Sequence, residues 1–314
     1  MGFIRAKKRL IIALLVAILG IAGSWFGWNW WASQKEKEVV FFQEMVDDFG
    51  EKVTVSKKPE KIVSLSPSNT EILFAIGAGD KVVGVTEYCD FPLEVLKVDK
   101  VGGFSTPNIE AIVAKSPDLV VAAYRTGEEN IQRLKELGLT VIALHPESLQ
   151  DVLGNITLVG KATGYEEDAE KLVKRLQEKI NLIKEKSESI PEEKRPRVLW
   201  LMWYPELWTA GDETFFHELL LIAGGKNIAH DLKGWKIISR EIVLARNPQI
   251  ILCSSMGGKQ SFLPQFLNDS QLAHTEAVKK GQIYELDPNT IERPGPRIVD
   301  GLEAISSYIL ETGG

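Results

Sequence analysis

Two stretches of this chain, 131 residues apart, repeat one pattern of residues. The first runs from Glu110 to Val121 and the second from Glu241 to Leu252, with an alanine, a basic residue and a proline at the same places in both. Each pattern predicts a helix that ends before the proline, followed by an apolar run long enough for a buried strand. A duplicated helix–strand unit indicates two similar lobes, each presenting one glutamate at an equivalent position.

Other parts of the chain repeat in the same order. The first predicted strand of each half lies at 61–65 and at 197–201. A glycine-rich helix end follows at 76–82 and at 222–228. A segment that begins with lysine comes late in each half, at 135–142 and at 279–284. Helix–proline–strand joints are common in α/β proteins, and the helix dipole favours glutamate at any helix start, but three recurrences in one order favour duplication. We therefore expect a cleft for a ligand between the lobes and a two-point docking surface made by Glu110 and Glu241.

The N-terminus has the pattern of a membrane segment. Four basic residues between positions 5 and 9 precede an uncharged run of 25 residues from Leu10 to Gln34, enough to cross about 30 Å of hydrocarbon. Four tryptophans cluster at its far end, as in an interfacial aromatic belt. We predict an uncleaved anchor that places the rest of the chain outside the cytoplasm; the alternative is a signal peptide cleaved near 22–24. No cysteine lies near the end of the apolar run, which excludes lipoprotein processing.

Beyond the anchor, apolar runs alternate with helical patterns. Predicted strands at 62–65, 82–86, 119–123 and 140–144 are separated by helices near 69–77, 108–115 and 128–137, which indicates a mostly parallel sheet covered on both faces. Between the lobes, Glu166 to Ser187 keeps helical spacing and predicts one amphipathic helix about 33 Å long. The predicted fold is α/β, with two similar lobes joined by one long helix. The predicted divisions are an anchor (1–34), a linker with a β-hairpin (35–58), a first lobe (59–147), a helical connector (148–194) and a second lobe (195–314).

Composition and motifs argue against several classes of protein. The net charge is −6 and basic residues cluster only at the N-terminus, which disfavours nucleic acid as a partner. There is no Gly-x-Ser-x-Gly elbow, no phosphate-binding loop and no His-x-x-x-His pair. Cys89 and Cys253 lie in different halves and are expected to be free thiols. We therefore predict no catalytic residues, no bound metal and no cofactor.

The candidate ligand contacts lie in loops that follow predicted strands, where open α/β sheets bind their ligands. Trp203, Tyr204 and Trp208 follow a strand of the second lobe in a proline-containing loop, and such rings suit a large, flat, partly apolar ligand. In the first lobe, the loops 66–69, 86–92 and 102–108 are expected to face the same cleft. Arg293 and Arg297 lie in another such loop and offer guanidiniums to acidic or amide groups.

Residues 46–310 resemble the substrate-binding proteins of ABC importers, specifically the helical-backbone receptors for vitamin B12, iron-siderophores and haem. The resemblance is to the cobalamin-binding members most of all. It depends on Ser-Pro-Ser-Asn-Thr-Glu at 66–71, Tyr-Cys-Asp-Phe-Pro at 88–92, Glu-Arg-Pro-Gly-Pro-Arg at 292–297, and the segments around 108–119 and 239–248. Phe104 stands where the cobalamin-binding members have tryptophan, and Ala223 stands where they have a cysteine of a second-lobe disulfide.

The resemblance implies that Glu110 and Glu241 pair with arginines of an ABC permease dimer, which works with its ATPase subunits. It implies a monomeric, non-catalytic receptor for cobalamin or another corrinoid at the outer face of the cytoplasmic membrane. The alternatives are a ferric-siderophore or haem receptor, a membrane-anchored sensor that does not transport, and an enzyme on a nitrogenase-like scaffold, which two cysteines are too few to support. The predicted ligand-binding residues are Ser66, Pro67, Ser68, Asn69, Tyr88, Phe104, Trp203, Tyr204, Trp208, Trp235, Arg293 and Arg297.

Overall fold

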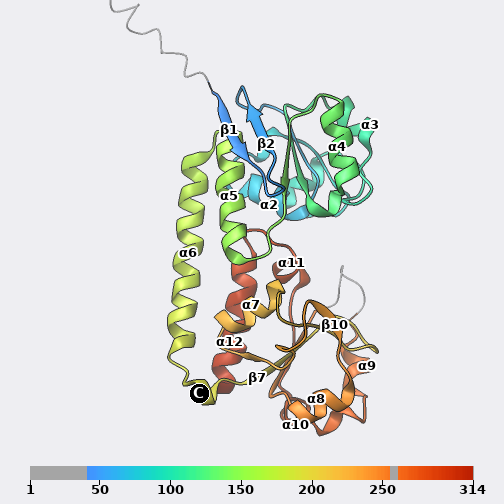
Figure 1. Cartoon of the computed structure of the whole chain (residues 1–314), viewed down its shortest axis with the longest axis vertical. Coiled ribbons are helices and arrows are strands. Elements are labelled where there is room, and N and C mark those ends of the chain that lie inside the picture. Colours follow the sequence, from blue (N-terminus) through green and yellow to red (C-terminus); the bar gives the residue numbers. More distant parts are fainter. Residues whose placement is uncertain (1–40, 255–260, 314) are drawn as a thin grey trace, which may run out of the picture. The chain divides into compact units, whose positions relative to one another are not determined.

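The structure is a computed structural model that describes residues 41–254 and 261–313 (Figure 1). The chain divides into two compact units, 1–41 and 42–314, and the second is described below. The predicted anchor at 1–34 lies outside the described residues. Within the described part of the chain, no helix combines the length and the apolar character needed to span a membrane.

Two four-stranded parallel sheets form the centres of two lobes. The first sheet has the order β4-β3-β5-β6 and the second has the order β12-β11-β7-β9, so both read 2-1-3-4 when each lobe's strands are counted along the chain. This common order confirms the predicted α/β fold with two similar lobes. The strands are β3 (Ile62–Ser64), β4 (Val82–Val85), β5 (Leu119–Ala123), β6 (Val141–Leu144), β7 (Arg197–Leu201), β9 (Lys226–Asn227), β11 (Ile250–Cys253) and β12 (Ile283–Glu285).

The repeated sequence unit is the second helix–strand pair of each lobe, and it ends in the third strand of that lobe's sheet. In the first lobe α3 (Ile109–Ala114) leads into β5, and in the second α8 (Arg240–Arg246) leads into β11. Pro117 and Pro248 lie between the helix and the strand in both cases. The sequence repeat therefore corresponds to a repeat of the fold.

Strands β4, β5, β6 and β11 are continuous apolar runs because parallel sheets are covered on both faces. Every residue of β3, β6 and β11 is buried. Helices supply the covering layers: α2 (Pro67–Ala75) and α4 (Glu128–Glu136) in the first lobe, and α7 (Phe215–Ile222), α9 (Leu263–Leu267), α10 (Glu276–Lys280), α11 (Pro288–Ile291) and α12 (Ile298–Gly313) in the second. Helix α2 ends at a left-handed turn through Gly77, whose φ of 87° favours glycine.

The connector contains two helices that lie side by side (Figure 1). Helix α6 (Glu166–Glu188) is the long helix predicted at 166–187, and it packs against α5 as well as against α7 and α12 of the second lobe. The sequence analysis did not predict α5 (Leu149–Thr163) as a helix of its own. A Cβ on Gly160 of α5 would lie 2.3 Å from the Cβ of Ala169, so glycine permits the close approach of α5 and α6.

Two small antiparallel ribbons complete the described region. Strands β1 (Gln43–Val46) and β2 (Lys52–Val55) form a hairpin, and the carboxylate of Asp48 fixes it to the first lobe by accepting hydrogen bonds from the backbone N–H of His145 and from Asn155. Strands β8 (Trp208–Ala210) and β10 (Trp235–Ile237) form the second ribbon, on the second lobe.

Candidate functional site

The carboxyl ends of the two sheets face each other. The evidence is a set of ion pairs between the loop that follows β12 and the segments that follow β3 and β4. Arg297 Nε donates to Glu71 Oε2 over 2.9 Å, and Arg293 Nη1 donates to Asp90 Oδ1 over 2.6 Å and to Glu71 Oε1 over 3.3 Å. The strand-end loops in which the sequence analysis placed the ligand contacts therefore lie on the facing edges of the two lobes.

We call these four residues, Glu71, Asp90, Arg293 and Arg297, the interlobe ion cluster. Glu71 is only 3% exposed. The hydrogen bond to Glu71 raises the pKa of Arg297, and the hydrogen bond from Arg293 lowers the pKa of Asp90 against the opposing effect of burial. Both arginines were predicted to contact ligand, and in this structure both pair with acids of the other lobe.

The backbones of the two lobes also approach closely beside this cluster. A Cβ on Gly295 would lie 3.3 Å from the carbonyl oxygen of Ser68. The guanidinium of Arg297 covers the ring of Phe91, with 4.0 Å between Cζ and the ring centroid. The first lobe thus contributes both an apolar and an acidic surface to this contact.

The predicted ligand residues at 66–69 have roles inside the first lobe. Ser66 caps α2 by accepting from the backbone N–H of Asn69, and its hydroxyl also bonds that of Ser68. The side chain of Asn69 donates to the carbonyls of Val121 and Ala122 and so fixes α2 to β5. Ser66, Ser68 and Asn69 are buried, and Pro67, at the first turn of α2, is partly buried.

A row of rings follows the strands of the first lobe. Tyr88 and Phe104 lie 4.9 Å apart between ring centroids, and Tyr88 is 52% exposed. The guanidinium of Arg125 is 5.9 Å from the Phe104 ring and 5.6 Å from the Tyr124 ring, which in turn stacks on His145 at 4.5 Å. These residues come from the loops after β4, β5 and β6, so the row runs along the carboxyl edge of the sheet.

The sequence analysis did not identify Tyr124 or Arg125 as site residues. Tyr124 directly follows β5 and is 44% exposed, and Arg125 donates from Nε to the Tyr124 hydroxyl over 2.7 Å. Both residues directly follow a predicted strand, and loops at strand ends are where open α/β sheets bind their ligands. That position is the signal in the sequence that identifies them.

In the second lobe, the loop after β7 divides its aromatic side chains between the surface and the core. Trp203 is 41% exposed and pairs with Trp208 through a β-bridge. Tyr204 instead packs against Phe266, and its hydroxyl donates to Asp269 Oδ2 over 3.2 Å. Trp203 and Trp208 remain candidates for ligand contact, whereas the Tyr204 side chain packs within the lobe.

The β8–β10 ribbon presents an apolar face. Trp208 lies opposite Ile237 and Ala210 lies opposite Trp235, so Trp208, Trp235 and Ile237 project from the same face of the ribbon. Trp235 is 38% and Ile237 is 54% exposed. Ile237, like Tyr124 and Arg125, was not predicted; its signal in the sequence is its place two residues after Trp235, on the same face of a strand.

The two predicted docking carboxylates occupy equivalent places. Glu110 lies in the first turn of α3 and Glu241 in the first turn of α8; both are exposed, and Asn108 and Ser239 cap the two helices. Figure 1 shows α3 at the right-hand edge of the upper lobe and α8 near the lower end of the lower lobe, both apart from α6. Hydrogen bonds from its own backbone N–H and from Ser239 lower the pKa of Glu241.

Both cysteines are free, as predicted, and both are buried. The Cys89 sulfur lies 3.2 Å from the hydroxyl of Thr70 and 3.1 Å from that of Thr86, in the interior of the first lobe. Burial raises the pKa of Cys253 to about 12. Among residues 41–254 and 261–313, no three His, Cys, Asp or Glu side chains gather as metal ligands would.

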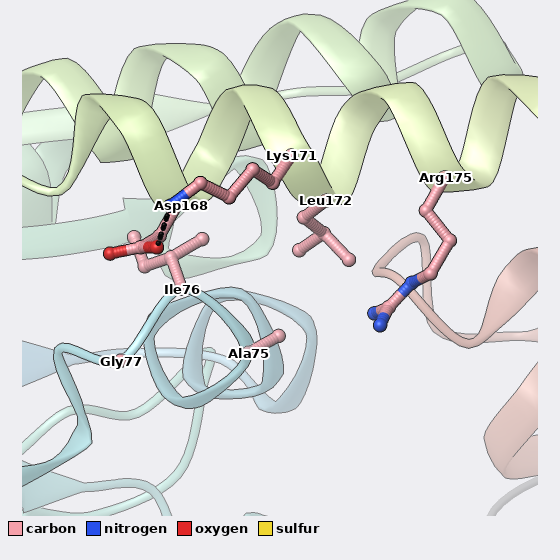
Figure 2. A pocket seen from close by; sticks show the side chains of 7 residues that line it. All are labelled: Ala75, Ile76, Gly77, Asp168, Lys171, Leu172 and Arg175. Carbon is pink, nitrogen blue, oxygen red and sulfur yellow. Dashed lines mark hydrogen bonds and ion pairs between the residues drawn. The ribbon is translucent and has the colours of Figure 1, made fainter.

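A hollow of about 420 Å³ lies elsewhere, between the end of α2 and the side of α6 (Figure 2). Asp168 and Lys171 on its wall pair with each other over 3.1 Å, and Arg175 projects beside them from the same helix. Its lining contains no aromatic residue and none of the predicted ligand residues. We therefore centre the candidate site on the facing sheet edges and not on this hollow.

Comparison with known proteins agrees with this architecture. Residues 62–290 match the family model described as "Periplasmic binding protein". The chain belongs to this family. Its members are solute-binding proteins rather than enzymes, and they bind small molecules and work with ABC permease and ATPase components.

Three similar proteins carry names that bear on the ligand. An uncharacterized ABC transporter substrate-binding lipoprotein, YvrC of Bacillus subtilis, is 35% identical over 96% of this chain and 98% of its own length. A vitamin B12-binding protein of Photorhabdus laumondii is 29% identical over 81% of this chain and 90% of its own. The periplasmic heme-binding protein RhuT of Roseiflexus has a solved structure with a TM-score of 0.71, 27% identity, and coverage of 81% of this chain and 99% of its own.

Proposed function

We propose that this protein captures cobalamin or a related corrinoid outside the cytoplasm and delivers it to an ABC permease dimer with its ATPase subunits. The observation that carries the proposal is the pair of aromatic surfaces at the facing sheet edges. Tyr88, Phe104 and Tyr124 belong to the first lobe, and Trp203 and Trp235 belong to the second. Exposed rings contributed by two lobes suit a large, flat ligand that offers an apolar surface to each lobe.

Polar recognition is proposed to come from the strand-end loops around these rings. Arg125 is 5.9 Å from the Phe104 ring and forms no ion pair with any acid in the described residues. It is therefore available to carbonyl oxygens of peripheral amides, such as those of a corrinoid. Arg293 and Arg297 would reach the ligand only by exchanging contacts now made to Asp90 and Glu71.

A ferric-siderophore or haem receptor is the second candidate, and the exposed side chain of Tyr88 favours it. Tyrosine oxygen is an established ligand of haem iron, and Tyr88 is 52% exposed beside the Phe104 ring. The similarity to the Roseiflexus heme-binding protein supports the same alternative. Titration of the solubilised full-length protein with cyanocobalamin, haem and a ferric chelate distinguishes the candidates. Saturable binding of haem or of the chelate, without binding of cyanocobalamin, would refute the corrinoid assignment.

Delivery is proposed to use Glu110 and Glu241 as two anchor points for arginines of the permease. Both carboxylates are exposed at equivalent helix starts. We expect Glu110→Ala combined with Glu241→Ala to abolish uptake while ligand affinity stays unchanged. If ligand affinity is lost in that variant, the docking assignment is wrong.

We further propose that the segment 1–34 remains attached as a membrane anchor and that the protein acts as a monomer. The Bacillus relative is named as a lipoprotein, but the first cysteine of this chain is Cys89, far beyond the apolar run and buried in the first lobe. An uncleaved helix would supply the tether that a lipid supplies elsewhere. N-terminal sequencing of protein recovered from membranes tests this, and a new N-terminus near residue 24 would contradict it.

A further inference from the structure

An exposed aliphatic side chain lies one helical turn beyond each proposed docking carboxylate. Val113, three residues after Glu110 on α3, is 40% exposed, and Leu244, three residues after Glu241 on α8, is 36% exposed. Residues three apart on a helix share a face, so each carboxylate has an aliphatic neighbour on the same surface. In each helix the residue directly before the aliphatic one, Ile112 or Val243, is buried and faces the core.

The next residue extends the match. Ala114 and Ala245 follow the aliphatic residues, and both are exposed. A glutamate, an aliphatic residue and an alanine at positions i, i+3 and i+4 thus form one stripe on each lobe. The small alanine leaves room for another protein surface to approach the helix closely.

The two stripes also have the same arrangement of charged side chains around them. The basic residue at i+5 is neutralised within its own lobe: Lys115 pairs with Asp99, and Arg246 pairs with Asp231, with 2.6 Å between Nη1 and Oδ1. Within residues 41–254 and 261–313, neither Glu110 nor Glu241 forms an ion pair with a cationic side chain. Each stripe therefore presents one unpaired negative charge beside an apolar side chain.

The two stripes also have the same place in the fold. Each precedes the third strand of its lobe, β5 or β11, in sheets of the same strand order. The two stripes are therefore equivalent in the same way that the two lobes are equivalent. Such a surface is complementary to a partner that presents two equivalent copies of one receiving site, as a dimer of identical or similar subunits does.

We propose that Val113 and Leu244 are the apolar half of the permease-docking surface. Each would enter a nonpolar recess beside a cationic side chain, one on each permease subunit. Their burial would exclude water from the neighbouring ion pair, which strengthens a contact that is otherwise weak and screened by salt. This inference rests on the proposed function, since it assumes that the two glutamates dock on a permease.

The test compares full-length variants for binding to the permease–ATPase complex of the same organism, reconstituted in nanodiscs. We expect Val113→Ser combined with Leu244→Ser to raise the Kd for the complex about tenfold, a factor that corresponds to about 1.4 kcal/mol. Binding should also become more sensitive to salt, because water now reaches the ion pairs. Val113→Thr combined with Leu244→Asn, which nearly preserves side-chain size, should behave in the same way.

Leu182→Ser is the matched control, since Leu182 is a 56% exposed aliphatic residue on α6, away from both stripes. It should leave the Kd unchanged, and all variants should bind ligand normally. If the glutamate variants weaken docking and both aliphatic pairs leave it unchanged, this inference is wrong while the proposed function stands. If the glutamate variants dock normally as well, the docking assignment fails and the inference fails with it.

Discussion

The pair between Glu71 and Arg297 provides a quantitative prediction about stability. Glu71 is 3% exposed and accepts two hydrogen bonds from Arg297, whereas its contact with Arg293 is a single bond of 3.3 Å. Arg297→Ala would leave a buried carboxylate with that one long contact. Loss of one partner of a buried ion pair typically costs about 3–5 kcal/mol. Because Arg293 remains nearby, we expect a loss of about 3 kcal/mol in the free energy of unfolding.

Urea unfolding followed by circular dichroism measures this change. Glu71→Leu combined with Arg297→Met removes both charges and fills the space with apolar atoms, so it should recover most of the loss. Lys115→Ala serves as the control, because it removes a surface pair with Asp99 and should leave the unfolding midpoint unchanged.

Two results would refute this reasoning. A loss below about 1 kcal/mol for Arg297→Ala would place the pair in the range of exposed ion pairs and deny that its burial matters. A double variant as unstable as Arg297→Ala alone would show that the charge left on Glu71 is not the cause of the loss.

Three further predictions concern pH, thiol reactivity and ligand binding. The pKa of Asp90 is lowered by Arg293, so wild type should be more stable than Asp90→Asn above the ordinary carboxyl pKa of 3.8, and urea midpoints should show this advantage disappearing as the pH falls below that value. Cys253, with a pKa of about 12, should resist iodoacetamide at pH 8 until urea unfolds the protein; reaction in the native state would contradict its burial. Trp235→Ala should weaken corrinoid binding about tenfold or more in a fluorescence titration, while Leu182→Ala should not.

Much of the fold was predictable because parallel sheets leave a clear pattern in the sequence. Their strands are buried on both faces, so β5 and β6 appear as uninterrupted apolar runs within one residue of their observed bounds. Helix α6 was equally clear, since its polar face is exposed and its apolar face follows helical spacing. The duplication was visible because both lobes kept similar residues at the α3–β5 and α8–β11 joints.

Helix α5 was missed because its sequence has little to distinguish it. Gly154 and Gly160 lower its intrinsic helix propensity, and much of its surface is buried, so the contrast between polar and apolar faces is weak. Packing against α6 at Gly160 and Ala169 supplies the stabilisation. Tertiary contacts of this kind are not visible in local spacing.

For the site residues, the sequence predicts which side chains are exposed better than it predicts which side chains form ion pairs with each other. Tyr88 and Trp203 are exposed as the loop argument expected, whereas Tyr204 and Trp208 of the second loop are partly buried. The interlobe ion cluster was not foreseen, because Glu71 and Arg297 are 226 residues apart and nothing in the local sequence links them. Their pairing depends on how two separately folded sheets face each other.

The same contacts bear on how the receptor behaves when it binds ligand. Within residues 41–254 and 261–313, the lobes are joined by the interlobe ion cluster, by helix α6, and by the hydrogen bond from the backbone N–H of Leu149 to Glu218, over 2.9 Å. With the lobes joined at three places, ligand capture should leave the separation of the two docking stripes nearly constant.

Nitroxide labels on Val113→Cys and Leu244→Cys measure that separation, because both positions are exposed and both native cysteines are buried. Electron paramagnetic resonance distances with and without cyanocobalamin, or with haem if that proves to be the ligand, should agree within about 2 Å, the scale that separates side-chain adjustment from domain movement. A larger change on binding would mean that the three connections do not hold the lobes. The permease would then meet a different spacing of carboxylates in the loaded receptor than in the empty one.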